Sequence, residues 1–388
     1  MLMWIKKLLL ILLLTAPAFG VNTFSFRIVL AGADTFTIPI AAGGAGYAHN
    51  FTVHWDDGEA DSEVTAYNDG DATHSYAGAG TYDIIITGTC EWFGFNGTAA
   101  DRLLVTAMLS FTGDCGFKVF DLWGCSNMTT IVPLGTMASL TTLRNAFLSC
   151  PNITAVPDNM FAGCTAVTSF HYTFGFCYGI TTVGTGTFAN CAAALDFTGT
   201  FYTCSGLTTI GSGMFTDCVN ATTFYETFRN CYLLAGLPDG FFDGCVKATS
   251  FHGTFIYCYS LATVPANLFA NNVLVTNFIS AFFDCKKLQL NTTIFYAEAD
   301  RDTRFLNQTV TFSHTFYRSS AFIGTQGTAP DVWACNFGTG TPTSTNCFAT
   351  TGGNNLTSLD NYNSIPVAWG GPYVAPVGGG QVIMIQEF

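Results

Sequence analysis

The cysteines are the side chains of this sequence with the greatest capacity for chemistry, because thiols form disulfides, ligate metals and act as nucleophiles. Ten of the 15 cysteines fall into two series in which every step is 27 residues. The first series is Cys150, Cys177, Cys204, Cys231, Cys258 and Cys285. The second is Cys164, Cys191, Cys218 and Cys245, with Asn272 at its next position. This spacing is typical of a structural repeat.

Other reactive patterns are missing from the sequence. There is no Cys-x2-Cys pair, which makes a zinc site unexpected, and the six histidines share no metal-ligand spacing. His171 and His252 occupy equivalent repeat positions but stand three repeats apart, too far to share one ion. Nucleophile elbows, phosphate loops and zinc-protease motifs are absent too. The sequence therefore predicts a non-enzymatic protein without a cofactor or a metal.

One acidic cluster could bind calcium, because hard cations prefer clustered oxygen ligands. It consists of Asp56, Asp57, Glu59, Asp61 and Glu63. These residues lack EF-hand spacing, so the sequence favours a solvated acidic turn over a calcium site.

The pairing of the thiols has two interpretations. Stacked repeats would place equivalent cysteines about 5 Å apart, which disulfide geometry accepts. The regular spacing beside large apolar residues instead favours buried thiols that act as small hydrophobic groups. The cysteines outside the series, Cys90, Cys115, Cys335 and Cys347, are better disulfide candidates. The odd number of cysteines leaves at least one thiol unpaired or bonded between chains.

The residues beside the cysteines repeat with the same period. Phenylalanine precedes each second-series position by three residues, at Phe161, Phe188, Phe215, Phe242 and Phe269. It also stands three and seven residues before the first series, as at Phe174 and Phe170. A fixed period of 27 predicts a solenoid whose stacked columns form one continuous core. The apolar spacing i, i+4, i+7 predicts a short helical turn after the strand of each coil.

Thr173, Thr200, Thr227 and Thr254 form another column. They could present hydroxyl groups to a crystalline or glycan ligand. Their position next to core phenylalanines favours hydroxyls that satisfy backbone groups inside each coil.

The repeat resembles the BspA-like leucine-rich repeats of bacterial surface proteins. The resemblance rests on stretches such as Thr173-Phe174-Gly175-Phe176-Cys177-Tyr178-Gly179-Ile180, and it covers about half of the chain. It implies a right-handed leucine-rich-repeat solenoid at 111–320.

Residues 21–110 are predicted to form a separate β-sandwich, because short alternating runs are separated by turn-forming residues. The runs are Phe24–Leu30, Thr35–Ile40, Phe51–Trp55 and Tyr82–Thr87. Two motifs, Trp55-Asp56-Asp57-Gly58 and His74-Ser75-Tyr76, resemble the PKD-type immunoglobulin-like domain. The first departs from the Gly-Asp-Gly usual in that family.

The two ends of the chain carry different signals. Lys6 and Lys7 precede a short apolar run and the small residues Ala16, Ala18 and Gly20, which predicts a signal peptide at 1–20. No later stretch is long enough to span a membrane. Residues 321–388 are interpreted as a degenerate capping coil with a tail strand at 378–388 that could pair with another chain. The charged stretch 297–304 is predicted to be an exposed loop.

Tyrosines are prominent among the residues that vary between coils and must therefore face outward. The residues that follow the first-series cysteines from Cys177 to Cys285 are Tyr178, Ser205, Tyr232, Tyr259 and Lys286. Tyrosine offers an apolar ring and a polar tip at low entropic cost. We predict a contact patch centred on Tyr232 and Tyr259, with Tyr178 and His252 as further candidates. Alternatively, these rings only cover the edge of the phenylalanine core.

The composition supports the same class of function. A net charge of -13 with only 13 basic residues excludes a nucleic-acid-binding surface. The leading hypothesis is a secreted or cell-surface adhesion protein that binds a protein or a glycan. The alternative is a self-associating subunit of an extracellular or viral, tail-associated assembly.

Overall fold

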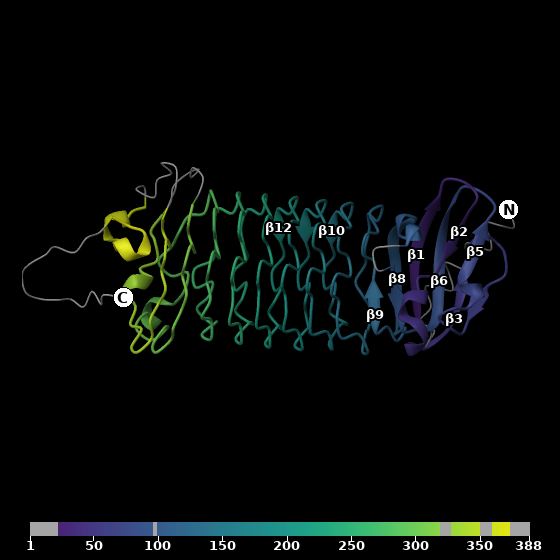
Figure 1. Cartoon of the computed structure of the whole chain (residues 1–388), viewed down its shortest axis with the longest axis horizontal. Coiled ribbons are helices and arrows are strands. Elements are labelled where there is room, and N and C mark those ends of the chain that lie inside the picture. Colours follow the sequence, from purple (N-terminus) through teal and green to yellow (C-terminus); the bar gives the residue numbers. More distant parts are fainter. Residues whose placement is uncertain (1–21, 96–98, 319–326, 350–358, 373–388) are drawn as a thin grey trace, which may run out of the picture.

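The protein is an elongated rod with a β-domain at one end and stacked coils along the rest of its length (Figure 1). The computed structural model describes residues 22–95, 99–318, 327–349 and 359–372. The predicted signal peptide at 1–20 and the predicted tail strand at 378–388 lie outside these residues.

The β-domain is built on a five-stranded antiparallel sheet in the order β4-β3-β6-β1-β8. A two-stranded sheet, β2-β5, accompanies it. The strands are β1 (Thr23–Leu30), β2 (Asp34–Thr37), β3 (His49–His54), β4 (Ser62–Val64), β5 (Thr73–Tyr76), β6 (Gly80–Cys90) and β8 (Val105–Thr112). Alternation along β1 buries Phe24, Phe26 and Ile28. Phe26 contacts Phe36 of β2, with ring centroids 5.7 Å apart, so the small sheet packs over the large one.

The two motifs that resemble a PKD-type domain meet in this core. The His74 ring stacks on Trp55 with centroids 4.8 Å apart, and the Tyr76 hydroxyl donates a hydrogen bond of 3.1 Å to the Trp55 carbonyl. His74 Nε2 lies 2.6 Å from Asp57 Oδ2. The turn after Trp55 is thereby tied to the β5 strand.

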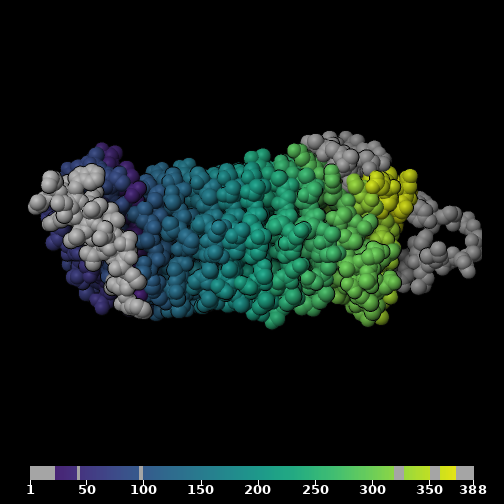
Figure 2. Space-filling view, turned by 180° about the vertical axis from the view of Figure 1, so that it is seen from behind, coloured from purple at the N-terminus to yellow at the C-terminus, as the bar shows by residue number. Residues whose placement is uncertain are grey.

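The β-domain continues directly into the coils. Strand β7 (Trp92–Gly94) pairs in parallel with β9 (Val119–Asp121), and the Met108 N–H donates to the Thr130 carbonyl at 2.9 Å. Figure 2 shows the side chains of the β-domain and the coils in one continuous surface on the face in view. The first coil therefore covers β8, which would otherwise be an exposed edge strand of the five-stranded sheet.

The coils pair through parallel strands, as the 27-residue period predicts. Strands β10 (Ala155–Val156), β11 (Thr182–Val183) and β12 (Thr209–Ile210) form a parallel sheet with equivalent residues in register. Single parallel bridges on another side of the coils join Thr142 to Ser169, Ser169 to Asp196, and so on to Thr343. The helices of the described residues are all short 3-10 helices outside the regular coils: η1 (Ala41–Gly46), η2 (Gly70–Ala72), η3 (Ala100–Leu103), η4 (Glu298–Asp300), η5 (Val332–Ala334), η6 (Tyr362–Ser364) and η7 (Val367–Trp369).

The short helical turn predicted within each coil is wrong. The backbone there takes left-handed conformations, with φ of 50° at Tyr172 and 59° at Phe176. Its N–H groups alternate between two kinds of acceptor. The Thr173 N–H donates to Phe170 in the same coil, and the Phe174 N–H donates to Thr200 in the next coil. The i, i+4, i+7 spacing therefore comes from consecutive tight turns, each of which points one large side chain inward.

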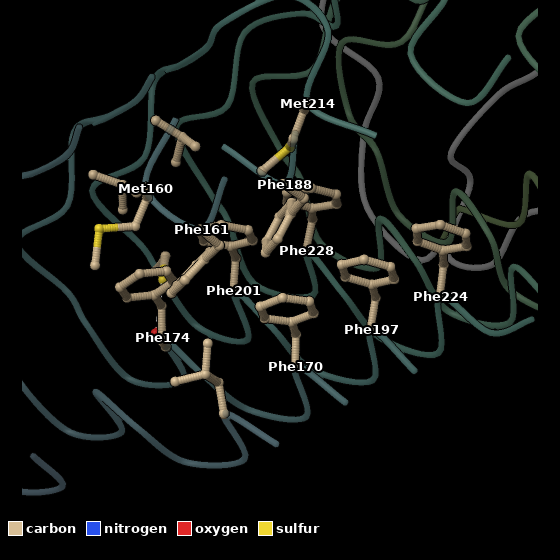
Figure 3. Close-up of a cluster of buried hydrophobic side chains, with 14 of the residues drawn as sticks. Met160, Phe161, Phe170, Phe174, Phe188, Phe197, Phe201, Met214, Phe224 and Phe228 are labelled. Carbon is tan, nitrogen blue, oxygen red and sulfur yellow. Dashed lines mark hydrogen bonds between the residues drawn. The ribbon is translucent and has the colours of Figure 1, made fainter. Parts of the chain in front are cut away.

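Phenylalanine columns fill the interior of the coils (Figure 3). In one column, Phe201 and Phe228 stack with centroids 5.4 Å apart and ring planes 1° apart. Neighbouring columns meet edge to face, as Phe197 and Phe215 do at 5.0 Å and 77°. These rings are buried, which confirms the predicted core.

The cysteines pack between these rings as hydrogen-bond donors. All 15 lie in the described residues, all are buried, and none forms a disulfide. Each first-series thiol after Cys150 donates to a backbone carbonyl thirty residues earlier: Cys204 Sγ lies 3.1 Å from the Phe174 oxygen, and Cys258 Sγ lies 3.2 Å from the Phe228 oxygen. The structure thus favours buried thiols, including at the predicted disulfide candidates Cys90, Cys115, Cys335 and Cys347.

Threonine and asparagine side chains also donate hydrogen bonds to backbone carbonyls, each from its own column. The Thr200 hydroxyl lies 2.9 Å from the Phe170 carbonyl oxygen and is fully buried, so the threonine column serves the backbone rather than a ligand. Asn272 replaces a second-series cysteine, and its Nδ2 donates to the Phe242 carbonyl at 2.9 Å.

The charged stretch 297–304 is only partly the exposed loop that we predicted. Glu298, Ala299 and Asp300 are exposed, but Arg304 is 4% exposed. Its guanidinium donates to the carbonyls of Phe295 and Asn272, at 3.1 and 2.9 Å. Burial lowers the pKa of Arg304 to about 10. The Arg304 side chain therefore lies against the coil that contains Asn272, near the point where the 27-residue period changes.

We predict that Phe228→Ala lowers the free energy of unfolding by about 3–5 kcal/mol, because it leaves a cavity in a stacked column. Denaturant unfolding of both proteins measures the difference. A change within about half a kcal/mol, typical of an exposed site, would contradict the column assignment.

The thiols should be inert in the folded protein and reactive after unfolding. Burial raises the pKa of the Cys177, Cys204 and Cys258 thiols well above the ordinary value. We expect little alkylation of the native protein, and alkylation of most column cysteines once the protein is denatured without a reducing agent. Mass spectrometry reads both states, with pre-reduced protein as the control. Column cysteines paired from coil to coil would refute the thiol assignment.

Candidate aromatic binding band

Partly exposed aromatic side chains, together with two cations, form a band along one corner of the coils. We call this set the aromatic band: Tyr172, Phe176, Tyr178, Tyr202, Tyr225, Arg229, Tyr232, His252, Tyr257, Tyr259, Phe283, Lys286 and Tyr317. Ring contacts and cation–π contacts link its members from Tyr172 through Tyr202 and Arg229 to Tyr257, and from there to Tyr317. The predicted contact residues are all in the band.

The tight turns next to the first-series cysteines position the band. Residues of these turns alternate between core and surface, so Phe174 and Cys177 point inward while Phe176 and Tyr178 remain accessible. Equivalent residues recur in each coil at the spacing of hydrogen-bonded strands, about 5 Å. Glycine makes room for one ring: a Cβ at Gly199, where φ is +58°, would lie 2.7 Å from the Tyr172 ring.

The predicted centre of the patch is a stack of adjacent rings. Tyr232 and Tyr259 lie with centroids 5.2 Å apart and ring planes 8° apart. The Lys286 ammonium lies 3.8 Å from the centroid of Tyr259 and extends the stack by one coil. The structure thus brings these residues together, and both tyrosines remain partly accessible.

Tyr178 and His252 occupy other parts of the band. Tyr178 is 48% exposed and contacts Phe176 at 6.3 Å, two coils away from Tyr232. His252 is half-buried, and Tyr225 contacts it edge to face at 4.9 Å. Burial lowers the pKa of His252 below its usual value against an opposing effect of Glu226, so the imidazole is neutral at neutral pH.

An ion pair near the middle of the band could not be identified from the sequence. Arg229 pairs with Glu226, and its guanidinium lies 5.9 Å from the ring centroids of both Tyr202 and Tyr257. Glu226 is only 8% exposed. Comparing columns could have revealed this pair, because charge at these two positions occurs in one coil only, but no pattern indicates that the guanidinium joins two rings.

The acidic cluster does not form a metal site. Asp57 and Asp61 pair with His74 and His54, and Asp56 accepts the Asp83 N–H at 3.0 Å. Nowhere in the described residues do three or more potential ligands gather in a way that could hold a metal ion. Three carboxylates of the cluster, those of Asp56, Asp57 and Asp61, thus have partners within the β-domain.

None of the helices in the described part of the chain is long and apolar enough to cross a membrane. Comparison with protein-family models, with curated proteins and with solved structures finds no match to the chain.

Proposed function

We propose that this protein is an exported or cell-surface repeat protein that binds a partner protein or glycan through the aromatic band and performs no catalysis. The single observation that carries the proposal is the connected, partly exposed row of rings from Tyr172 to Tyr317. A row of rings on the surface of a protein whose core is already filled by phenylalanine supports a role in recognition.

The chemistry of the band suits recognition. Tyrosine rings bury a large area at low entropic cost, and their hydroxyls can hydrogen-bond at the rim of an interface. The Glu226–Arg229 ion pair holds the side chains in the middle of the band in place. Binding of a partner therefore requires little further ordering of these side chains. A pre-organised surface of this kind fits an adhesion protein.

The finer structural assignments belong to the same proposal. The 27-residue period and the Thr-Phe-x-x-Cys motif support a right-handed, BspA-like leucine-rich-repeat solenoid. The packing of His74 on Trp55 supports a PKD-like sandwich at 21–110. Residues 1–20 support export to the outside of the cell.

A second candidate function is that of a subunit in an extracellular or viral, tail-associated assembly. It is favoured by a column of exposed valines on successive coils, Val219, Val246 and Val273, with exposed fractions of 41%, 44% and 48%. Exposed apolar columns of this kind are common where chains associate.

We predict that replacing Tyr232 and Tyr259 together with serine abolishes binding, because it removes the central stack. The melting temperature should stay within a few degrees, since both rings lie outside the phenylalanine core. A glycan and host-surface binding array measures the loss. The matched control is the double variant Leu103→Ser and Leu195→Ser, which removes exposed apolar side chains outside both the band and the valine column. Unchanged binding, or loss of the fold, would remove the stack from consideration.

The assembly function predicts that the chain self-associates. Size-exclusion chromatography with light scattering should then show oligomers, and Val246→Lys should dissociate them by placing a charge in the valine column. A strict monomer at every concentration would contradict the assembly function and leave the adhesion function.

A further inference from the structure

One position interrupts the tyrosine column of the aromatic band. The residues that follow the five first-series cysteines from Cys177 to Cys285 are Tyr178, Ser205, Tyr232, Tyr259 and Lys286. Tyr232, Tyr259 and Lys286 form a continuous stack. Ser205 is the only small residue among them, so no ring of this column covers the face of Tyr232 toward Ser205.

The spacing of the coils sets the distance across this interruption. Tyr232 and Tyr259 are one coil apart, with ring centroids separated by 5.2 Å. Tyr178 and Tyr232 are two coils apart, which corresponds to roughly 10 Å at the spacing of paired strands. The Tyr178 ring contacts the Phe176 ring two residues earlier, with centroids 6.3 Å apart. The Tyr259 ring contacts the Tyr257 ring in the same way at 5.8 Å, so the Tyr178 and Tyr259 rings leave their coils in similar directions. A flat group between Tyr178 and Tyr232 would therefore contact both rings.

The protein itself shows which group fits such a space. Arg229 lies between two rings of the band, Tyr202 and Tyr257, 5.9 Å from each centroid. Lys286 covers Tyr259 at 3.8 Å. Both cations of the band thus lie over tyrosine faces, in an arrangement that stabilises them through the ring quadrupoles.

Charge also favours a cation at this position. The chain has a net charge of -13, which attracts basic partners and repels acidic ones. The first cation of this column after Tyr178 is Lys286, which lies three coils beyond Ser205. An arginine brings a planar guanidinium that stacks on aromatic faces and keeps its charge.

We propose that Tyr178, Ser205 and Tyr232 form a binding site for one arginine side chain of a basic partner protein. The guanidinium stacks between the two rings above Ser205, as Arg229 does between Tyr202 and Tyr257. This inference rests on the proposed binding function of the aromatic band and specifies one part of it.

The test uses the full chain and two peptides that differ in a single charge. The first is acetyl-Gly-Gly-Arg-Gly-Gly-amide, and the second carries citrulline, which is uncharged but nearly the same shape, in place of arginine. Nuclear magnetic resonance titration should show that the arginine peptide shifts the Tyr178 and Tyr232 ring signals. The citrulline peptide should bind at least tenfold more weakly. Equal binding of both peptides would overturn the proposal and indicate a site for neutral groups.

Variants separate this site from the rest of the band. Ser205→Arg should fill the site from within the chain, as Arg229 does nearby, and reduce peptide binding at least tenfold without lowering the melting temperature. Tyr178→Leu should give a similar loss. The matched control is Thr182→Arg, which adds the same charge on the exposed β11 strand and should retain most of the binding.

The outcomes also distinguish the two proposals. Loss of array binding in the Tyr232 and Tyr259 double variant, together with unchanged peptide binding by Ser205→Arg, would reject the arginine site and keep the binding function of the band. Unchanged array binding in the double variant would reject the central stack as the binding surface, whatever the peptides show.

Discussion

The coils depend on one recurring hydrogen bond, from a small core side chain to a backbone carbonyl of the preceding coil. Within the 27-residue repeats, the Cys204 thiol, the Thr200 hydroxyl and the Asn272 amide each reach a carbonyl thirty residues earlier. Thiols are weak donors but small and apolar, so they serve the carbonyl without opening the core to water. A valine of similar size has no donor group, so these carbonyls would lose the side-chain hydrogen bond that they accept in addition to a backbone N–H. The same geometry explains why adjacent thiols do not form disulfides, since each points at a carbonyl rather than at its neighbour.

This bond also fixes the surface of the band. Because each coil is anchored to the preceding one at the turns beside its first-series cysteine, the residues of those turns recur at nearly constant spacing. The ring contacts of the band reflect this: the stacked pairs Tyr232–Tyr259 and Phe283–Tyr317 have centroid distances of 5.2 and 5.0 Å. The core thus imposes a regular spacing on the surface, while the residue types at each surface position remain free to vary.

The sequence was sufficient to predict which residues of the repeat are buried, and insufficient for the backbone of the turns and for contacts that occur in one coil only. The phenylalanine columns could be predicted because burial at a period of 27 leaves one consistent explanation, and the stacking of Tyr232 on Tyr259 followed from the same register. The turns of the coils could not, because the spacing of Phe170, Phe174 and Cys177 fits a helix equally well until hydrogen bonds between coils are known. The burial of Arg304 and the place of Arg229 between two rings also depend on contacts that occur once.

Interruptions of a column are therefore the informative positions in this protein, and they are of two kinds. Asn272 interrupts a cysteine column but keeps the hydrogen bond to the preceding coil, so the column continues with another donor. Ser205 interrupts a tyrosine column without supplying a ring or a cation in its place. An interruption that preserves the interaction is explained by the fold. One that leaves a face of Tyr232 without a ring or cation of its own column, on a surface where Arg229 and Lys286 already cover other rings, points to a group that comes from outside the chain.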